Sequence, residues 1–148
     1  MNPLTLHELL PVLQLAIGPV ILISGVGLLM LTVTNRFGRV VDRSRVLARE
    51  LAGNPPPPEA DRIRAQLQVF DRRAAFLRAS CMLLAVTILS AALLILMLFV
   101  ASLAGFEQGI AIVLVFAVGQ LALIGSVIMF IRDINLSLAA LRLETQPR

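Results

Sequence analysis

The 148-residue chain has no lysine, tryptophan or tyrosine, one cysteine and one histidine. The lone Cys81 excludes an internal disulfide and a zinc site built on cysteines. His7 stands alone, and neither clustered carboxylates nor a glycine-rich phosphate loop occurs, so we expect no enzyme, no bound metal and no cofactor. Because no tryptophan or tyrosine is interleaved with the basic residues, we expect no nucleic-acid binding despite a pI near 11.3.

Charged residues are also missing from three long stretches of the chain. Residues 9–33, 79–104 and 110–131 contain no acidic and no basic side chain. Each stretch can cross a bilayer core as a helix, which takes about twenty apolar residues. The sequence therefore predicts an all-α integral membrane protein, a single domain over residues 1–148 with three transmembrane helices and a cytoplasmic helical hairpin.

The thirteen basic residues, all arginines, lie unevenly around the three predicted spans. Residues 36–78 carry ten arginines against five acidic residues, and residues 132–148 carry three against two. The leader before residue 9 and the turn at residues 105–109 contain no arginine. Positive charge marks cytoplasmic loops. We therefore predict a plasma-membrane location with the amino terminus outside, the tail 132–148 in the cytoplasm, and the arginines facing the anionic lipids of the inner leaflet.

Residues 36–78 are not continuously apolar like the spans. Their apolar side chains recur at every third or fourth position instead. This pattern indicates amphipathic helices on either side of the four prolines at residues 55–58. Because the prolines cannot propagate a helix, we predict a turn there, with the second helix running into the span 79–104. The charged faces are either solvated surface with weak ion pairs, or a vestibule or docking surface that attracts anions or acidic partners.

Several short motifs carry a resemblance to a known family. The first span contains Ala-Ile-Gly-Pro at residues 16–19, followed by Thr-Asn-Arg at 34–36 and Arg-x-x-Asp-Arg at 39–43. Phe-Ile-Arg-Asp-Ile at residues 130–134 looks like the ending of that family. Over nearly its whole length the chain resembles an uncharacterised family of small bacterial inner-membrane proteins, domain of unknown function 2721. The resemblance implies a three-span bacterial inner-membrane protein with no assigned activity.

Charged residues gather where the first and third spans meet the cytoplasm. Arg36, Arg39 and Arg43 lie along one helix face, either as anchors that snorkel to the interface or as a site for an anion or lipid headgroup. We expect Asp133 to pair with Arg36. We also expect Arg132 to pair with Asp42. The candidate lipid, anion or gating cluster comprises Asn35, Arg36, Arg39, Asp42, Arg43, Arg132 and Asp133.

Polar residues inside the spans are few and uncharged, which argues against a proton relay. Pro19 is predicted to kink the first span. Small residues such as Gly18, Gly25 and Gly119 form seams along which helices pack closely. Three helices make a thin bundle, so we expect some of these seams to serve a homo-oligomer. The candidate intramembrane polar or kink positions are Gln14, Pro19, Thr32 and Gln120.

Two classes of function remain open. The first is an ion-conducting or transport assembly, with the polar positions along its lining and the arginines at its inner mouth. The alternative is a non-catalytic scaffold or regulatory subunit that docks a partner on the arginine-rich hairpin. The polar positions of the spans favour the first class slightly.

Overall fold

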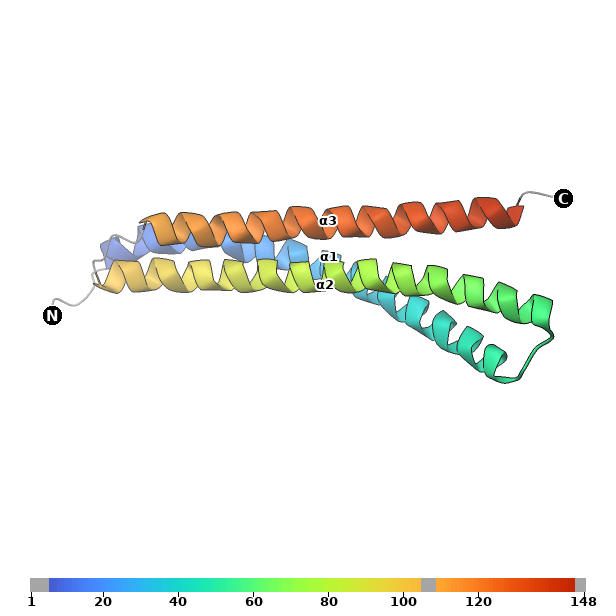
Figure 1. Ribbon diagram of the computed structural model, residues 1–148. Coiled ribbons are helices and arrows are strands. Elements are labelled where there is room, and N and C mark those ends of the chain that lie inside the picture. Colours follow the sequence, from blue (N-terminus) through green and yellow to red (C-terminus); the bar gives the residue numbers. More distant parts are fainter. Residues whose placement is uncertain (1–5, 105–108, 146–148) are drawn as a thin grey trace. The chain divides into compact units, whose positions relative to one another are not determined.

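The computed structural model describes residues 6–104 and 109–145, and every element in this part of the chain is a helix. The elements are α1 (Leu6–Ala52), α2 (Pro57–Ala104) and α3 (Gly109–Thr145) (Figure 1). Each helix contains a segment long and apolar enough to cross a membrane. The predicted all-α membrane architecture is therefore confirmed. The turn predicted at residues 105–109 lies outside the described residues except for its last glycine.

All three helices extend beyond the charge-free stretches into the charged segments beside them. Helix α1 stays helical through Pro11 and Pro19. Prolines are tolerated in membrane helices where neighbouring groups satisfy the backbone atoms that they free. Helix α3 continues to Thr145, so most of the tail predicted for residues 132–148 is a direct extension of the third span.

The predicted proline turn is wrong in its second half. Pro57 and Pro58 belong to α2, whose first residue is Pro57. Amides in the first turn of a helix have no intrahelical acceptor, so proline fits there without losing a hydrogen bond. The amides of Glu59 and Ala60 instead donate to the carbonyl of Pro56, at 2.9 and 3.0 Å. The prolines therefore begin the second helix as well as end the turn.

The carboxyl end of α1 is closed by local hydrogen bonds. The amide of Gly53 donates to the carbonyl of Glu50 at 3.2 Å, and that of Asn54 to the carbonyl of Leu51 at 3.2 Å. Asn54 has a φ of 53°, a left-handed conformation that asparagine adopts more readily than most residues. The chain thus leaves one helix and enters the next through residues 53–56 alone.

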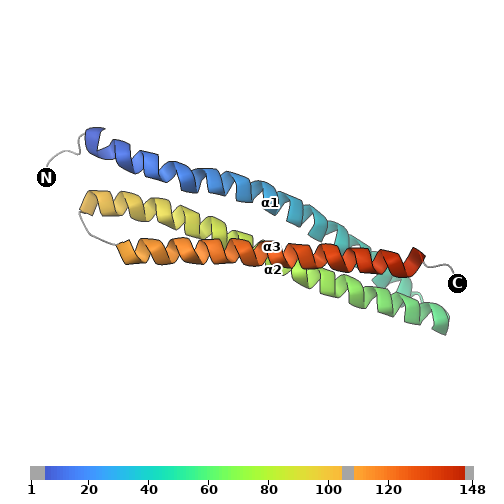
Figure 2. The ribbon, with the colours of Figure 1, turned by 90° about the horizontal axis from the view of Figure 1, so that it is seen from above.

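The chain divides into two compact units, and all three helices contribute to both. The first unit comprises residues 1–30 and 83–124, and the second comprises residues 31–82 and 125–148. Within each unit α2 and α3 run antiparallel (Figures 1 and 2). The second unit contains the turn between α1 and α2 and most of the arginines.

In the first unit, α2 and α3 pack through small and hydroxyl-bearing residues. The hydroxyl of Thr87 lies 3.0 Å from the carbonyl oxygen of Leu83 in its own helix and 3.3 Å from that of Gly119. A Cβ atom added at Gly119 would lie 3.0 Å from the Cβ of Ser90. The absence of a side chain at Gly119 therefore lets the two helices approach closely.

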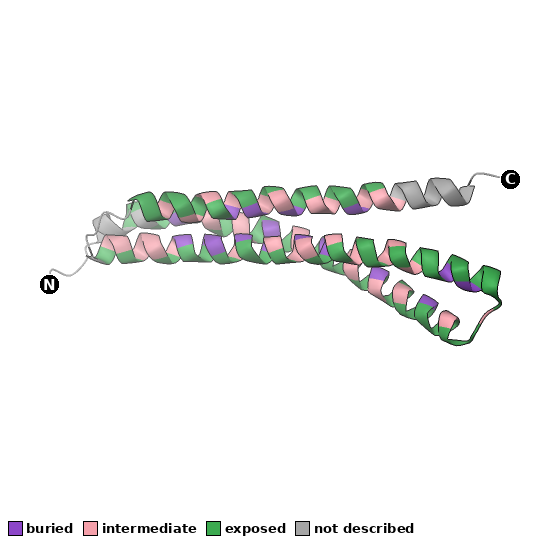
Figure 3. Cartoon of the chain, in the orientation of Figure 1, coloured by how far each residue is buried: buried purple, intermediate pink, exposed green. Residues whose placement is uncertain are grey.

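In the second unit, buried apolar residues recur along the hairpin arms. Val33, Val40 and Leu47 follow one another at intervals of seven in α1, and Ile63 and Leu77 lie fourteen apart in α2. Figure 3 shows buried residues as separate purple patches along the two arms. A seven-residue interval is typical of helices that pack as a coiled coil. The apolar stripe predicted from the sequence is thus the buried side of the hairpin.

Candidate functional site

Asp133 of α3 is fully buried, and it is the sole charged side chain so placed in the described part of the chain. The Nε of Arg73 donates to its Oδ1 at 3.0 Å, and the Nη2 of Arg36 lies 3.0 Å from its Oδ2. The second contact pairs charges without hydrogen-bond geometry, because Oδ2 accepts no hydrogen bond from the residues described. Guanidinium groups from two helices therefore compensate one buried carboxylate, as a buried charge requires.

The position of Arg73 follows from how α2 and α3 are aligned. The hydroxyls of Ser80 and Ser126 lie 2.8 Å apart, and each lies 3.1 Å from the main-chain carbonyl oxygen of the other residue. Arg73 precedes Ser80 by seven residues, and Asp133 follows Ser126 by seven. Two antiparallel helices that meet at one such pair meet again seven residues further along both. The serine pair therefore places Arg73 opposite Asp133.

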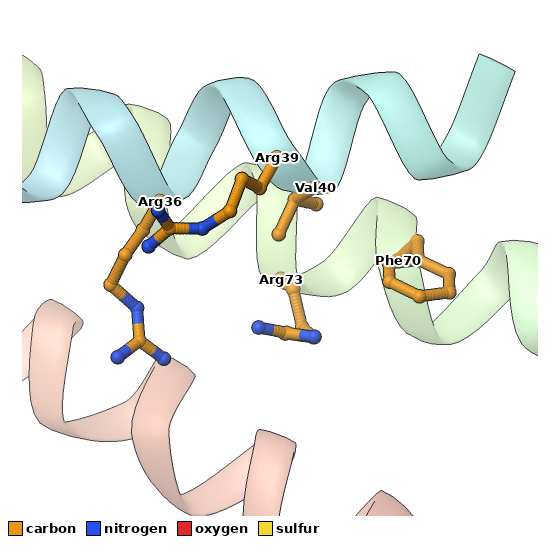
Figure 4. A pocket seen from close by; sticks show the side chains of 5 residues that line it. All are labelled: Arg36, Arg39, Val40, Phe70 and Arg73. Atoms are coloured by element: carbon orange, nitrogen blue, oxygen red, sulfur yellow. The ribbon is translucent and has the colours of Figure 1, made fainter.

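A cavity of about 380 Å³ lies beside the two guanidinium groups. Arg36, Arg39 and Val40 of α1 line it together with Phe70 and Arg73 of α2 (Figure 4). Arg39 forms no ion pair with any residue that the structure describes. Three positive charges against the single negative charge of the buried carboxylate leave a net charge of +2. The cavity therefore attracts anions.

Aromatic rings hold two of the three guanidinium groups. The Cζ of Arg36 lies 5.4 Å from the centre of the Phe130 ring, and that of Arg73 lies 5.7 Å from the centre of the Phe70 ring. Such cation–π contacts attract the guanidinium group to the ring face and so limit where it can lie. A guanidinium group carries more N–H donors than its contact with Asp133 uses. The remaining donors of Arg36 and Arg73 are therefore oriented in advance and available to a ligand.

The predicted cluster is brought together only in part. Arg36 and Asp133 form the expected ion pair, and Arg39 lines the cavity beside them. Asn35 and Arg43 are exposed on α1 and do not line the cavity. The face predicted for the arginines of α1 therefore contributes its first two members to the site.

The ion pair expected between Arg132 and Asp42 is not formed. Arg132 is exposed and pairs with no residue that the structure describes, and Asp42 lies 4.0 Å from Arg45 instead. Adjacent residues of a helix point in directions about 100° apart. Because Asp133 faces the interior, Arg132 is turned outward.

Arg73 was not among the predicted site residues, although it donates the hydrogen bond that Asp133 accepts. The signal that would have found it is the shared interval of seven, from Arg73 to Ser80 in one helix and from Ser126 to Asp133 in the other. This interval predicts the pairing of Arg73 with Asp133 only when the contact between Ser80 and Ser126 is known.

The four predicted intramembrane positions do not line the cavity. Gln14, Pro19 and Gln120 belong to the first unit, and Thr32 belongs to the second. Gln14 and Thr32 are exposed, whereas Pro19 and Gln120 are half-buried. These residues therefore do not form part of the charged site.

The fold and this site define an all-helical integral membrane protein with a positively charged cavity in its second unit. Residues 16–143 match the family described as Protein of unknown function (DUF2721). The chain belongs to that family, as the motifs at residues 34–43 predicted. A comparison with curated proteins finds no match, and neither does a comparison with solved structures.

Proposed function

We propose that the protein is a homo-oligomeric ion-conducting or transport component of the bacterial inner membrane. Its amino terminus lies outside, and its arginine-lined cavity forms the cytoplasmic mouth. The cavity is the observation that supports this proposal. Arg36 follows the first apolar stretch, Arg73 precedes the second, and Asp133 follows the third. A cluster of guanidinium groups at the end of the spans draws anions toward the membrane and favours them over cations.

Assembly of several copies is part of the proposal, because one chain buries little of its spans. In the most apolar window of each span, 17%, 28% and 17% of the residues are buried. The remaining faces contact lipid or other copies of the chain. Gly18 and Gly25 are exposed, with no atom within 4 Å of an added Cβ at either position. Another helix could therefore approach α1 closely along this face.

Gln14 supports the same arrangement. It precedes Gly18 by four residues, so both lie on one side of α1. Gln14 is also exposed, which leaves a polar amide on a face that would otherwise contact lipid. A ring of such amides around an axis would provide hydrogen-bonding groups to a passing ion or its water shell.

Planar-bilayer recording of purified protein under a potassium chloride gradient tests the proposal. We expect a current whose reversal potential shows preference for the anion. Arg39→Gln should reduce that preference, because it removes one positive charge from the cavity. Arg49→Gln serves as the matched control, since Arg49 is exposed on the same helix and does not line the cavity. Absence of current under every ion gradient, or a strict monomer in detergent, would refute the proposal.

A scaffold or regulatory subunit is the second candidate, and the exposure of the hairpin charges favours it. The side chains of Arg45 and Arg64 are 71% and 61% exposed, although each lies near an aspartate three residues before it. Their exposure leaves these guanidinium groups accessible to an acidic partner. For this function, Arg45→Gln with Arg64→Gln should abolish site-specific cross-links from the hairpin to a partner in cells. Two results together would refute the scaffold function. They are the absence of such cross-links in the wild-type protein and a current that is the same in the wild type and in the doubly substituted variant.

A further inference from the structure

We infer that the cavity lined by Arg36, Arg39 and Arg73 binds the phosphate group of a phosphate ester, either a soluble one or a lipid headgroup. The inference goes beyond conduction, because a phosphate could bind here in a protein that passes no ion.

The donors of the cavity are arranged for a polyatomic oxyanion. Arg36 and Arg73 are held by Asp133 and by aromatic rings, so their orientation is set before a ligand arrives. Arg39 completes the group from the neighbouring turn of α1, and all its N–H donors are available to a ligand. The planar fork of a guanidinium group matches two oxygens of a phosphate at once. A halide offers no such pair of acceptors.

The charge of the cavity supports the same ligand. Its three arginines and the one carboxylate that two of them share leave a net charge of +2. A phosphate monoester carries a charge of about −1.5 to −2 at pH 7. Such a ligand would neutralise the cavity, whereas a carboxylate or a chloride ion would leave it positive. Asp133 positions the guanidinium groups and is not itself a ligand-binding residue.

The remaining walls of the cavity indicate that the phosphate is esterified. Val40 and Phe70 add an apolar side to a volume of about 380 Å³, which exceeds what the phosphate group alone requires. Ligand sites typically combine a few polar groups that set orientation with apolar walls that contact the rest of the molecule. The apolar wall would contact the organic part of a phosphorylated metabolite or the glycerol region of a lipid. The two sources share the phosphate chemistry and differ in how they reach the cavity.

Binding of two probes to the full-length protein tests the inference and separates the sources. The first probe is glycerol 3-phosphate, titrated calorimetrically into protein in dodecyl maltoside. The second is phosphatidic acid in phosphatidylcholine nanodiscs, with retained lipid counted by native mass spectrometry. Arg39→Gln is the informative variant, because Arg39 forms no ion pair and its loss leaves the buried Asp133 contacts intact. Arg49→Gln is the control.

We expect Arg39→Gln to weaken binding of at least one probe by about tenfold or more, the effect of one charge-assisted contact. We expect Arg49→Gln to change it by less than about twofold, as for an exposed charge away from the ligand. Dependence on Arg39 in the detergent titration alone assigns the site to a soluble ester. Dependence in the nanodiscs alone assigns it to a lipid headgroup, and either result supports the inference. Failure of both probes to bind, or equal effects of the two substitutions, overturns it. Phosphate binding without current would refute the proposed conduction and leave this site intact.

Discussion

Replacing Arg73 by methionine removes the donor of the hydrogen bond that Asp133 accepts and leaves the carboxylate where it is. Asp133 is fully buried, and its other charged contact, with Arg36 at 3.0 Å, lacks hydrogen-bond geometry. Removing one partner of a buried ion pair typically costs about 3–5 kcal/mol, because the other charge stays buried with insufficient compensation. We expect a loss in this range for Arg73→Met.

The converse substitution, Asp133→Asn, should cost less. An asparagine keeps an oxygen that can accept the hydrogen bond from Arg73. The side chains of Arg36 and Arg73 are 27% and 17% exposed, so both retain some contact with their surroundings. The expected cost is about 1.5–3 kcal/mol, the range for a hydrogen bond to a charged group. The double variant should lose less unfolding free energy than the two single variants together, by up to about 3 kcal/mol. The reason is that the double variant no longer contains the buried carboxylate that Arg73→Met leaves without its hydrogen-bond donor.

Equilibrium unfolding in detergent micelles, followed by far-ultraviolet circular dichroism, measures these differences. The chain has no tryptophan, so helicity replaces the usual fluorescence signal. Arg72→Met is the matched control, because Arg72 is adjacent and exposed and should lose no more than about 0.5 kcal/mol. The reasoning fails if Arg73→Met loses no more unfolding free energy than Arg72→Met. It also fails if the loss in the double variant equals the sum of the losses for Arg73→Met and Asp133→Asn to within about 0.5 kcal/mol.

Two further predictions concern packing between α2 and α3. Gly119→Ala should destabilise the protein by about 1–3 kcal/mol, because the new Cβ would lie 3.0 Å from the Cβ of Ser90. Gly27→Ala, where nothing lies within 4 Å of the added Cβ and which faces away from Gly18, should not destabilise it, and equal losses in detergent unfolding would contradict the close approach. Ser80→Ala should cost about 0.6–1.7 kcal/mol, because it removes the hydroxyl that bonds to Ser126. An unchanged unfolding midpoint for Ser80→Ala would show that this pair adds nothing to stability.

The sequence predicted the features of this protein that depend on composition and local pattern. Charge-free stretches identify membrane helices because a charged side chain in the bilayer core is costly, whatever the tertiary structure. The ion pair between Arg36 and Asp133 was also expected, since both residues stand directly after a span and must lie near the same membrane surface. Local charge and membrane depth together were sufficient for that pair.

The partner from the second helix was not predicted, for a physical reason. Whether Arg73 faces Asp133 depends on the rotation and axial shift of α2 relative to α3, which neither helix specifies alone. Close packing sets both, through the serine pair of the second unit. The turn was misplaced for a simpler reason. Proline breaks a helix in its interior, which is why a turn is predicted over all of residues 55–58, whereas Pro57 occupies the start of a helix, where proline is well tolerated.

The alignment of Ser80 with Ser126 and of Arg73 with Asp133 also limits how the gene can change in length. Inserting one residue between Arg73 and Ser80 would rotate everything before it by about 100° and carry the guanidinium group off the face that meets Asp133. Only a change of seven residues would restore both face and pairing, and only if α3 changed by the same amount. In homologues, insertions and deletions should therefore collect at the turn 53–56 and beyond Asp133, and should avoid the two seven-residue intervals.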